Sequence, residues 1–135
     1  MTSIQAMNRR EALACAVAPL FVPRRVFGAN DRINVGIIGT GGRGNLLIDQ
    51  LPEKGQIIAA SDCYFKRCQD AAAKRKANWK LYDDYRRLLD SKEVDAVIVA
   101  THDHGRVLTS IHACQAGKDV YVEKPLTVYI EEGRA

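Results

Sequence analysis

The chain has 135 residues, a formal net charge of +4 and a hydrophobic fraction of 47%. This is the size and apolar content of one globular domain, which excludes a wholly disordered chain and a collagen. Four cysteines are too few to hold a disulfide scaffold of this length together.

The positive charge is concentrated in residues 1–29, where four arginines stand against a single glutamate. The rest of the chain is therefore nearly neutral. A nucleic-acid-binding domain needs a basic face, so we expect no nucleic-acid partner.

Residues 1–29 resemble an export leader. Arg9 and Arg10 precede an apolar stretch from Ala12 to Val22, and a charged segment before a short apolar run is typical of a signal peptide. Paired arginines are typical of the twin-arginine type. The apolar run is shorter than the roughly 20 residues that cross a membrane. We expect a periplasmic protein with no stable membrane span, or a cytoplasmic one if the leader does not function.

From residue 31 onward, short apolar runs alternate with amphipathic stretches. The sequence predicts strands over 33–38, 56–60, 80–82, 94–100 and 119–122, and helices over 43–53, 64–77, 84–89 and 106–116. Asp83 or Asp84 is expected to cap the third helix. Alternation at these lengths predicts an α/β fold over residues 30–135, a Rossmann-like doubly wound parallel sheet.

The first predicted strand ends in a glycine-rich turn that matches the pattern GxGxxG. After a strand and before a helix, the first glycine allows a tight turn, the second allows a pyrophosphate to approach the backbone, and the third allows the helix to pack close to the sheet. The helix N-terminus adds free N–H groups and a partial positive charge. A purely structural glycine turn is the alternative. The predicted cofactor-binding residues here are Gly39, Thr40, Gly41, Gly42, Arg43 and Gly44.

Asp62 follows the second predicted strand, 18 residues after Gly44. An acidic residue at about this distance binds the adenosine ribose hydroxyls of a dinucleotide, and its charge repels a 2′-phosphate. We therefore expect NAD as the cofactor in preference to NADP. Two features oppose this interpretation: Asp62 is also in position to cap the next helix, and Arg67 lies close enough to compensate for a 2′-phosphate.

Cysteine and histidine pairs give weak metal signals. Cys63 and Cys68 are five residues apart, unlike the CxxC spacing of metal and redox sites, and we expect both to be buried thiols. His102 and His104 follow the fourth predicted strand, but a full site needs further ligands. We expect no metal, and we place Thr101 and His104 near the cofactor because they follow a strand at the same edge of the sheet.

Glu123, Lys124 and Pro125 directly follow the last predicted strand. A lysine at this edge is partly desolvated over a substrate, where its ammonium polarises a hydroxyl or carbonyl oxygen during hydride transfer. Lys124 is the predicted catalytic residue.

Together these motifs resemble the Gfo/Idh/MocA oxidoreductases, the family of glucose-fructose oxidoreductase and inositol dehydrogenase, and specifically its exported members. The resemblance covers residues 31–135. It implies that Asp62 binds the adenosine ribose and that Thr101 and His104 line the nicotinamide side. It also implies that residues 123–125 are the family's EKP motif, in which Glu123 belongs to the cofactor site and the lysine contacts the substrate, with a cis peptide bond before the proline.

The chain departs from the family pattern at three positions and in length. His102 stands where proline is usual, Gly105 where a bulky aromatic is usual and Arg106 where histidine is usual, so we expect a looser nicotinamide pocket. The family's C-terminal domain, which recognises substrate and mediates oligomerisation, is expected to be absent. Without it, an apolar edge or face beside the fifth strand is expected to be uncovered, which lowers solubility.

These features predict the nucleotide-binding N-terminal domain of an NAD(P)-dependent oxidoreductase that transfers a hydride to or from a sugar, polyol or related substrate. Two alternatives remain open: a glycosidase that uses bound NAD transiently, and an inactive truncated cofactor-binding fragment. The resemblance implies that full-length relatives are homo-oligomers.

Overall fold

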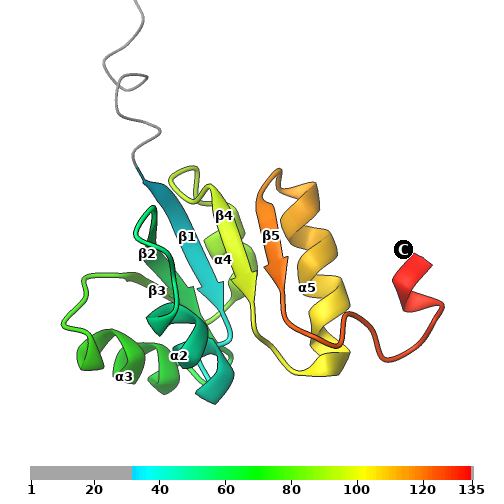
Figure 1. The fold of residues 1–135 in the computed structure, drawn as a ribbon, viewed down its shortest axis with the longest axis horizontal. Helices are drawn as coiled ribbons and strands as arrows, with labels where there is room; N and C mark the ends of the chain where they lie inside the picture. Colours follow the sequence, from blue (N-terminus) through cyan, green and yellow to red (C-terminus); the bar gives the residue numbers. More distant parts are fainter. Residues whose placement is uncertain (1–31, 135) are drawn as a thin grey trace, which may run out of the picture. The chain divides into compact units, whose positions relative to one another are not determined.

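The fold is known from a computed structural model that describes residues 32–134. Five parallel strands form one sheet in the order β3-β2-β1-β4-β5 (Figure 1). The predicted export leader lies outside the described residues. The strands are β1 (Ile33–Ile38), β2 (Gly55–Ser61), β3 (Lys80–Tyr82), β4 (Ala96–Val99) and β5 (Asp119–Val122).

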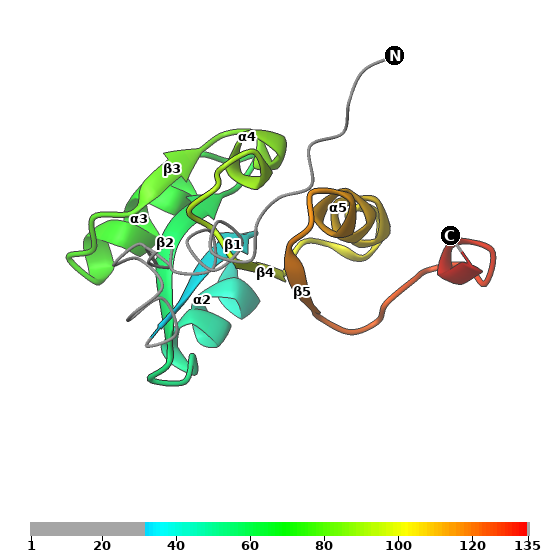
Figure 2. The same ribbon diagram turned by 90° about the horizontal axis from the view of Figure 1, so that it is seen from above.

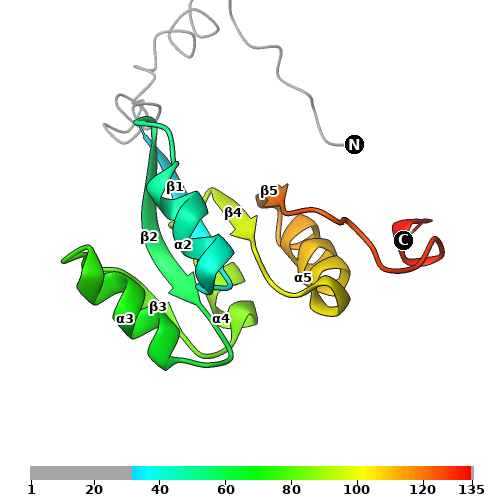
Figure 3. The ribbon, with the colours of Figure 1, turned by 60° about the horizontal axis from the view of Figure 1, so that its bottom comes forward.

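Helices cover the sheet from both sides, as right-handed crossovers require when the strand order reverses after β3. Helices α2 (Gly42–Asp49) and α3 (Lys66–Lys74) lie on one face, as Figure 3 shows. Helices α4 (Tyr85–Leu89) and α5 (Asp103–Gln115) contact each other and cover the opposite face (Figure 2). The doubly wound architecture predicted from the sequence is confirmed.

Each predicted strand and helix is present, but several boundaries were wrong. Helix α2 ends at Asp49, four residues before the predicted end, because Pro52 disfavours helical geometry in the residue before it and has no N–H to donate. Helix α3 is shorter at both ends than predicted. Strand β4 covers only Ala96–Val99 of the predicted 94–100. Helix α5 begins at Asp103, three residues earlier than predicted, although its first turn contains a glycine.

Two apolar clusters, one on each face, form the core. Ile37 packs toward α2 and α3, whereas the next residue, Ile38, packs toward α4 and α5. Strands buried on both faces are continuously apolar, as this one is. Cys68 is buried as predicted, and burial raises the pKa of its thiol. The same prediction for Cys63 was wrong, since Cys63 is exposed.

The amino end of the sheet carries an apolar cavity of about 590 Å³ on the α2 side of β1, β4 and β5. Ile33 is 50% exposed and Tyr121 is 54% exposed, so the uncovered apolar surface expected beside the fifth strand is present. The cavity lining includes Val35, Leu47, Leu51, Ile98 and Tyr121.

No helix within residues 32–134 is long and apolar enough to cross a membrane.

Candidate cofactor-binding site

Packing alone explains two of the three motif glycines in the turn after β1. Gly39 has a φ of +94°, which disfavours any side chain, and a Cβ there would lie 2.7 Å from the carbonyl oxygen of Ala100. A Cβ on Gly44 would lie 1.9 Å from the carbonyl oxygen of Gly39. A Cβ on Gly41, in contrast, would meet no heavy atom within 4 Å. Gly41, the second motif glycine, therefore leaves open space at the position where a diphosphate is expected.

Helix α2 begins inside this turn and presents its N-terminus at the open space. Gly41 occupies the N-cap position, so no side chain caps the helix there. The N–H groups of a first helical turn have no partner within the helix, and together with the helix dipole they favour an anion.

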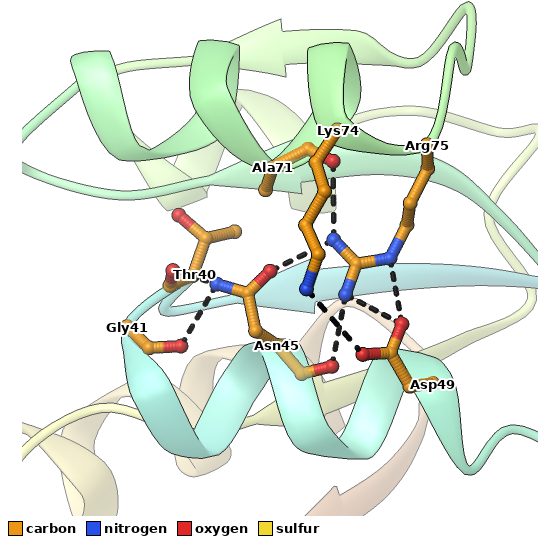
Figure 4. A network of polar contacts seen from close by, with 7 residues as sticks. All are labelled: Thr40, Gly41, Asn45, Asp49, Ala71, Lys74 and Arg75. Carbon is orange, nitrogen blue, oxygen red and sulfur yellow. Dashed lines mark hydrogen bonds and ion pairs between the residues drawn. The ribbon is translucent and has the colours of Figure 1, made fainter.

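A polar network holds the turn against α3 (Figure 4). The Asn45 amide donates to the carbonyl oxygens of Thr40, at 2.7 Å, and Gly41, at 3.1 Å. Arg75 donates to the side-chain oxygen of Asn45 at 2.8 Å and to its carbonyl oxygen at 3.0 Å. Its guanidinium also pairs with Asp49 at 2.6 Å. The turn is thus fixed before any ligand binds.

The Asp62 carboxylate connects the end of β2 to the same turn. Its Oδ2 accepts hydrogen bonds from the backbone N–H of Thr40 at 2.8 Å and from the Thr40 hydroxyl at 3.2 Å. Its Oδ1 accepts from the N–H of Tyr64 at 2.9 Å. Helix α3 begins with Phe65 at its N-cap, so Asp62 does not cap it. A carboxylate has about four acceptor positions, and the second position on Oδ1 accepts from the Cys63 thiol, a weak donor whose Sγ lies 3.8 Å away.

These elements border a cavity of about 620 Å³ at the carboxyl ends of the strands. This is where the strand order reverses, the usual ligand crevice of such sheets, and the volume is in the range of small-molecule sites. The predicted site residues that line it are Gly39, Gly41, Gly42, Arg43, Asp62 and Thr101.

The hydroxyl of Thr101 is buried and has no hydrogen-bond partner within the described residues. Because an unsatisfied buried hydroxyl is costly, its position in the cavity lining gives a ligand a polar group to bind. The open space at Gly41, the helix N-terminus, Asp62 and Thr101 fit a dinucleotide along the cavity.

Five predicted site residues lie outside the cavity lining. Thr40 is buried behind the turn and Gly44 packs against it. His104 is exposed and stacks on His102, with 5.0 Å between ring centroids. Glu123 is buried and Lys124 is exposed. A role for each in binding or catalysis stays a prediction.

Sequence reasoning did not assign several residues that do line the cavity. Most of them follow β2 or β3, and the strand pattern could have found them, because the carboxyl ends of parallel strands meet at one edge. His102 also lines the cavity, in place of the predicted His104. The unassigned lining residues outside β1, β2 and the end of β4 are Cys63, Arg67, Asp83, Asp84, Tyr85, Arg86, His102, Gly105 and Thr109.

Glu123 forms an ion pair with Arg43 of the glycine turn. The Arg43 Nε and Nη2 atoms donate to Glu123 Oε1 at 2.8 and 2.6 Å. These hydrogen bonds hold the pKa of Glu123 below its ordinary value. The N–H of Lys124 donates to Oε2 of the same carboxylate at 3.2 Å. The peptide bond between Lys124 and Pro125 is cis, which confirms the expectation from the family resemblance.

Arg106 joins the loop after β4 to the loop after β5. Its side chain is only 6% exposed, and it donates to the carbonyl oxygens of Thr101, at 2.6 Å, and Pro125, at 2.5 Å. Asp103 lies 3.1 Å away and is its ion-pair partner. At the neighbouring Gly105, a Cβ would meet no heavy atom within 4 Å. Position 105 is therefore open, whereas position 106 holds two loops together.

Within residues 32–134, no group of three or more His, Cys, Asp or Glu side chains is placed to hold a metal ion.

Comparison with protein families matches residues 33–135 to the Gfo/Idh/MocA group, described as "Oxidoreductase family, NAD-binding Rossmann fold". The inositol 2-dehydrogenase/D-chiro-inositol 3-dehydrogenase of Lacticaseibacillus casei is 30% identical over 102 residues, which cover 73% of this chain and 30% of that protein. The inositol 2-dehydrogenase of Pseudomonas fluorescens is also 30% identical, with the same coverage.

Solved structures agree with these sequence matches. The myo-inositol dehydrogenase of Lactobacillus casei, solved in complex with NAD(H) and myo-inositol, superposes with a TM-score of 0.73 at 29% identity, covering 76% of this chain and 31% of that one. An NAD-binding oxidoreductase of Klebsiella pneumoniae gives a TM-score of 0.65 at 31% identity, covering 76% and 30%. The chain spans about 30% of the length of the curated relatives it matches.

Proposed function

The chain belongs to the Gfo/Idh/MocA oxidoreductase family, and we propose that its cavity binds NAD, in preference to NADP, for a dehydrogenase that acts on a polyol or related sugar hydroxyl. The observation that carries the cofactor proposal is the position of Asp62, whose carboxylate is hydrogen-bonded to the glycine turn and lines the same cavity.

Electrostatics at Asp62 favour NAD. The residue is 7% exposed, and the Coulomb repulsion between its charge and a 2′-phosphate is strong in so dry a position. At Oδ1, a ribose hydroxyl competes for the second acceptor position with the weakly donating Cys63 thiol, whose Sγ lies 3.8 Å away. Arg67 lines the same cavity but is exposed, and its guanidinium lies over the Tyr64 ring at 5.6 Å from the centroid. Arg67 is the residue that would have to offset this repulsion for NADP to bind well.

The substrate proposal rests on the inositol dehydrogenase relatives and on Lys124. Bound NAD supplies the acceptor for a hydride. Lys124 follows β5 at the same edge of the sheet as the cavity, and its ammonium is proposed to donate a hydrogen bond to the substrate oxygen whose carbon loses the hydride. The hydroxyl proton passes to a separate general base as the hydride passes to NAD. Replacing Lys124 with Ala in the active enzyme should lower kcat while NAD affinity stays near its original value.

Export in the folded state is a separate proposal, supported by Arg9 and Arg10 before the apolar run. A reporter fused to residues 1–29 should reach the periplasm, and the change of both arginines to lysine should retain it in the cytoplasm. Equal export of both fusions contradicts this proposal.

Calorimetric titration of the 135-residue chain with NAD and with NADP tests the cofactor proposal. We expect saturable binding of NAD and at least about tenfold weaker binding of NADP. Asp62→Asn should weaken NAD binding by about 10- to 100-fold, because a charge-assisted hydrogen bond is lost. It should also reduce the ratio of the affinity for NAD to the affinity for NADP.

Asp70→Asn is the matched control, since Asp70 is an exposed carboxylate paired with Lys66 outside the cavity. It should bind NAD as the original chain does. Circular dichroism of each variant separates lost binding from lost folding. Equal affinity for the two cofactors, or a folded Asp62→Asn chain with unchanged NAD affinity, contradicts the proposal.

A further inference from the structure

Lys124 lies between two residues that are each held by an arginine from a distant part of the chain. On one side, the Glu123 carboxylate pairs with Arg43 of the glycine turn. On the other, the Pro125 carbonyl oxygen accepts a hydrogen bond from Arg106 of α5. The placement of Lys124 therefore depends on two guanidinium groups that do not belong to its own loop.

The two arginines differ in their access to a ligand. The side chain of Arg106 is 6% exposed, it donates to backbone carbonyl oxygens, and it does not line the cavity. The side chain of Arg43 is 50% exposed and lines the cavity, whereas Glu123 behind it does not. Of these two arginines, Arg43 is the one that lies between the cavity and the loop of Lys124.

Arg43 also retains donors for an anion. Its Nε and Nη2 atoms both donate to Glu123 Oε1, and within the described residues no partner is found for Nη1. A guanidinium has five N–H donors in a planar fork, so one edge can hold a carboxylate while another binds a phosphate oxygen. The N-terminus of α2, where Arg43 lies, is the position at which a diphosphate is expected.

We propose that Arg43 is a positioning residue that links the binding of the dinucleotide diphosphate to the placement of Lys124, acting through Glu123. The contacts run from the diphosphate to the Arg43 guanidinium, from there to Glu123 Oε1, and from Glu123 Oε2 to the Lys124 N–H. The inference rests on the proposed cofactor site. A diphosphate that draws Arg43 toward the cavity changes the hydrogen bond between Glu123 and the Lys124 N–H. Because coupling between two sites is reciprocal, the conformation of the Lys124 loop changes the affinity for the diphosphate by the same factor.

ADP-ribose is the probe that isolates this link, because it carries the diphosphate but no nicotinamide that could contact Lys124 directly. In amide NMR spectra of the 135-residue chain, ADP-ribose should shift the resonances of Gly41 and of Lys124. Adenosine, which lacks the diphosphate, should leave the Lys124 resonance in place.

Substitutions on the two sides of the ion pair separate the link from binding itself. Arg43→Gln should weaken ADP-ribose binding by about tenfold, and at saturation the Gly41 shift should remain while the Lys124 shift is lost. Glu123→Gln should also abolish the Lys124 shift, yet bind ADP-ribose at least as tightly, because Arg43 is freed from its anionic partner. Arg43→Lys keeps the positive charge but not the planar fork of N–H donors. Compared with Arg43→Gln, it should recover part of the affinity for ADP-ribose and a smaller part of the Lys124 shift.

Lys66→Gln is the control, since Lys66 is also an exposed cation paired with a carboxylate, Asp70, and both residues lie outside the cavity lining. It should behave as the original chain. A Lys124 shift that persists in a saturated Arg43→Gln chain overturns the inference and leaves the cofactor site standing. If ADP-ribose fails to bind the original chain, the proposed function falls, and this inference with it.

Discussion

The cofactor cavity lies at the carboxyl ends of the strands, and the two halves of this edge of the sheet are built differently. At the ends of β1 and β2, the site consists of backbone in tight contact, with Gly44 packed against the Gly39 carbonyl and Asp62 bonded to the N–H of Thr40. At the ends of β4 and β5, long charged side chains join loops that are far apart in sequence, 80 residues in the case of Arg43 and Glu123. The first side is a fixed cradle, whereas the second depends on ion pairs that a ligand or a change of pH can alter.

The largest expected effect lies in the cradle. Gly44→Ala places a Cβ at 1.9 Å from the Gly39 carbonyl oxygen, and relieving that overlap requires the turn and α2 to separate. We expect a loss of about 4 kcal/mol in the free energy of unfolding, measured by urea denaturation.

Gly41→Ala is the matched substitution in the same turn, with open space around its Cβ. It should cost less than about 1 kcal/mol of stability, while NAD affinity falls because the methyl group occupies the place of the diphosphate. If the two alanine variants lose equal stability, the division of roles between these glycines is wrong.

On the other side of the edge, Arg106→Met should lower the free energy of unfolding by about 3 kcal/mol. The cause is that the carbonyl oxygens of Thr101 and Pro125 lose their charged donor, and a hydrogen bond to a charged group contributes about 1.5–3 kcal/mol. Urea denaturation of Arg106→Met beside Arg87→Met measures the effect. Equal stability of the two variants would show that the bridge between the loops contributes nothing.

A smaller effect is expected where α3 supports the cradle. Arg75→Met removes the hydrogen bonds to Asn45 and Asp49 and should cost about 2 kcal/mol, measured by thermal unfolding. NAD affinity should fall only a few-fold, because Asn45 still bonds the Thr40 and Gly41 carbonyl oxygens. Unchanged stability contradicts the role given to this network.

The smallest effect is a pH dependence at the ion pair of Arg43 and Glu123. Because the pKa of Glu123 is lowered in the folded state, the carboxylate stabilises the fold above the ordinary glutamate pKa of about 4.3. This stabilisation is lost as the pH falls through the lower folded pKa. The stabilities of the original chain and of Glu123→Gln should therefore differ near pH 7, and the difference should shrink as the pH falls below about 4. A constant difference between them across that range rules out the ion pair as its source.

Local sequence predicts the first side of the site well and the second poorly. The GxGxxG turn and Asp62 follow strands whose apolar runs mark them clearly, so their place at one edge follows from topology. The bridges made by Arg43 and Arg106 depend on pairings across the whole domain, which no local pattern encodes. The early start of α5 was missed, because no side-chain cap marks it: His102 at the N-cap makes no capping hydrogen bond, and Gly105 lies in the first helical turn.

Hydrogen–deuterium exchange of the 135-residue chain with and without NAD distinguishes two places for the cofactor, because the sheet has a cavity at each end. We expect NAD to slow exchange in the peptides covering residues 39–45 and 61–64, at the carboxyl ends of β1 and β2. Slowed exchange confined to residues 47–55 and 119–121, which border the apolar cavity at the amino end, would contradict this expectation, as would no change anywhere at saturating NAD.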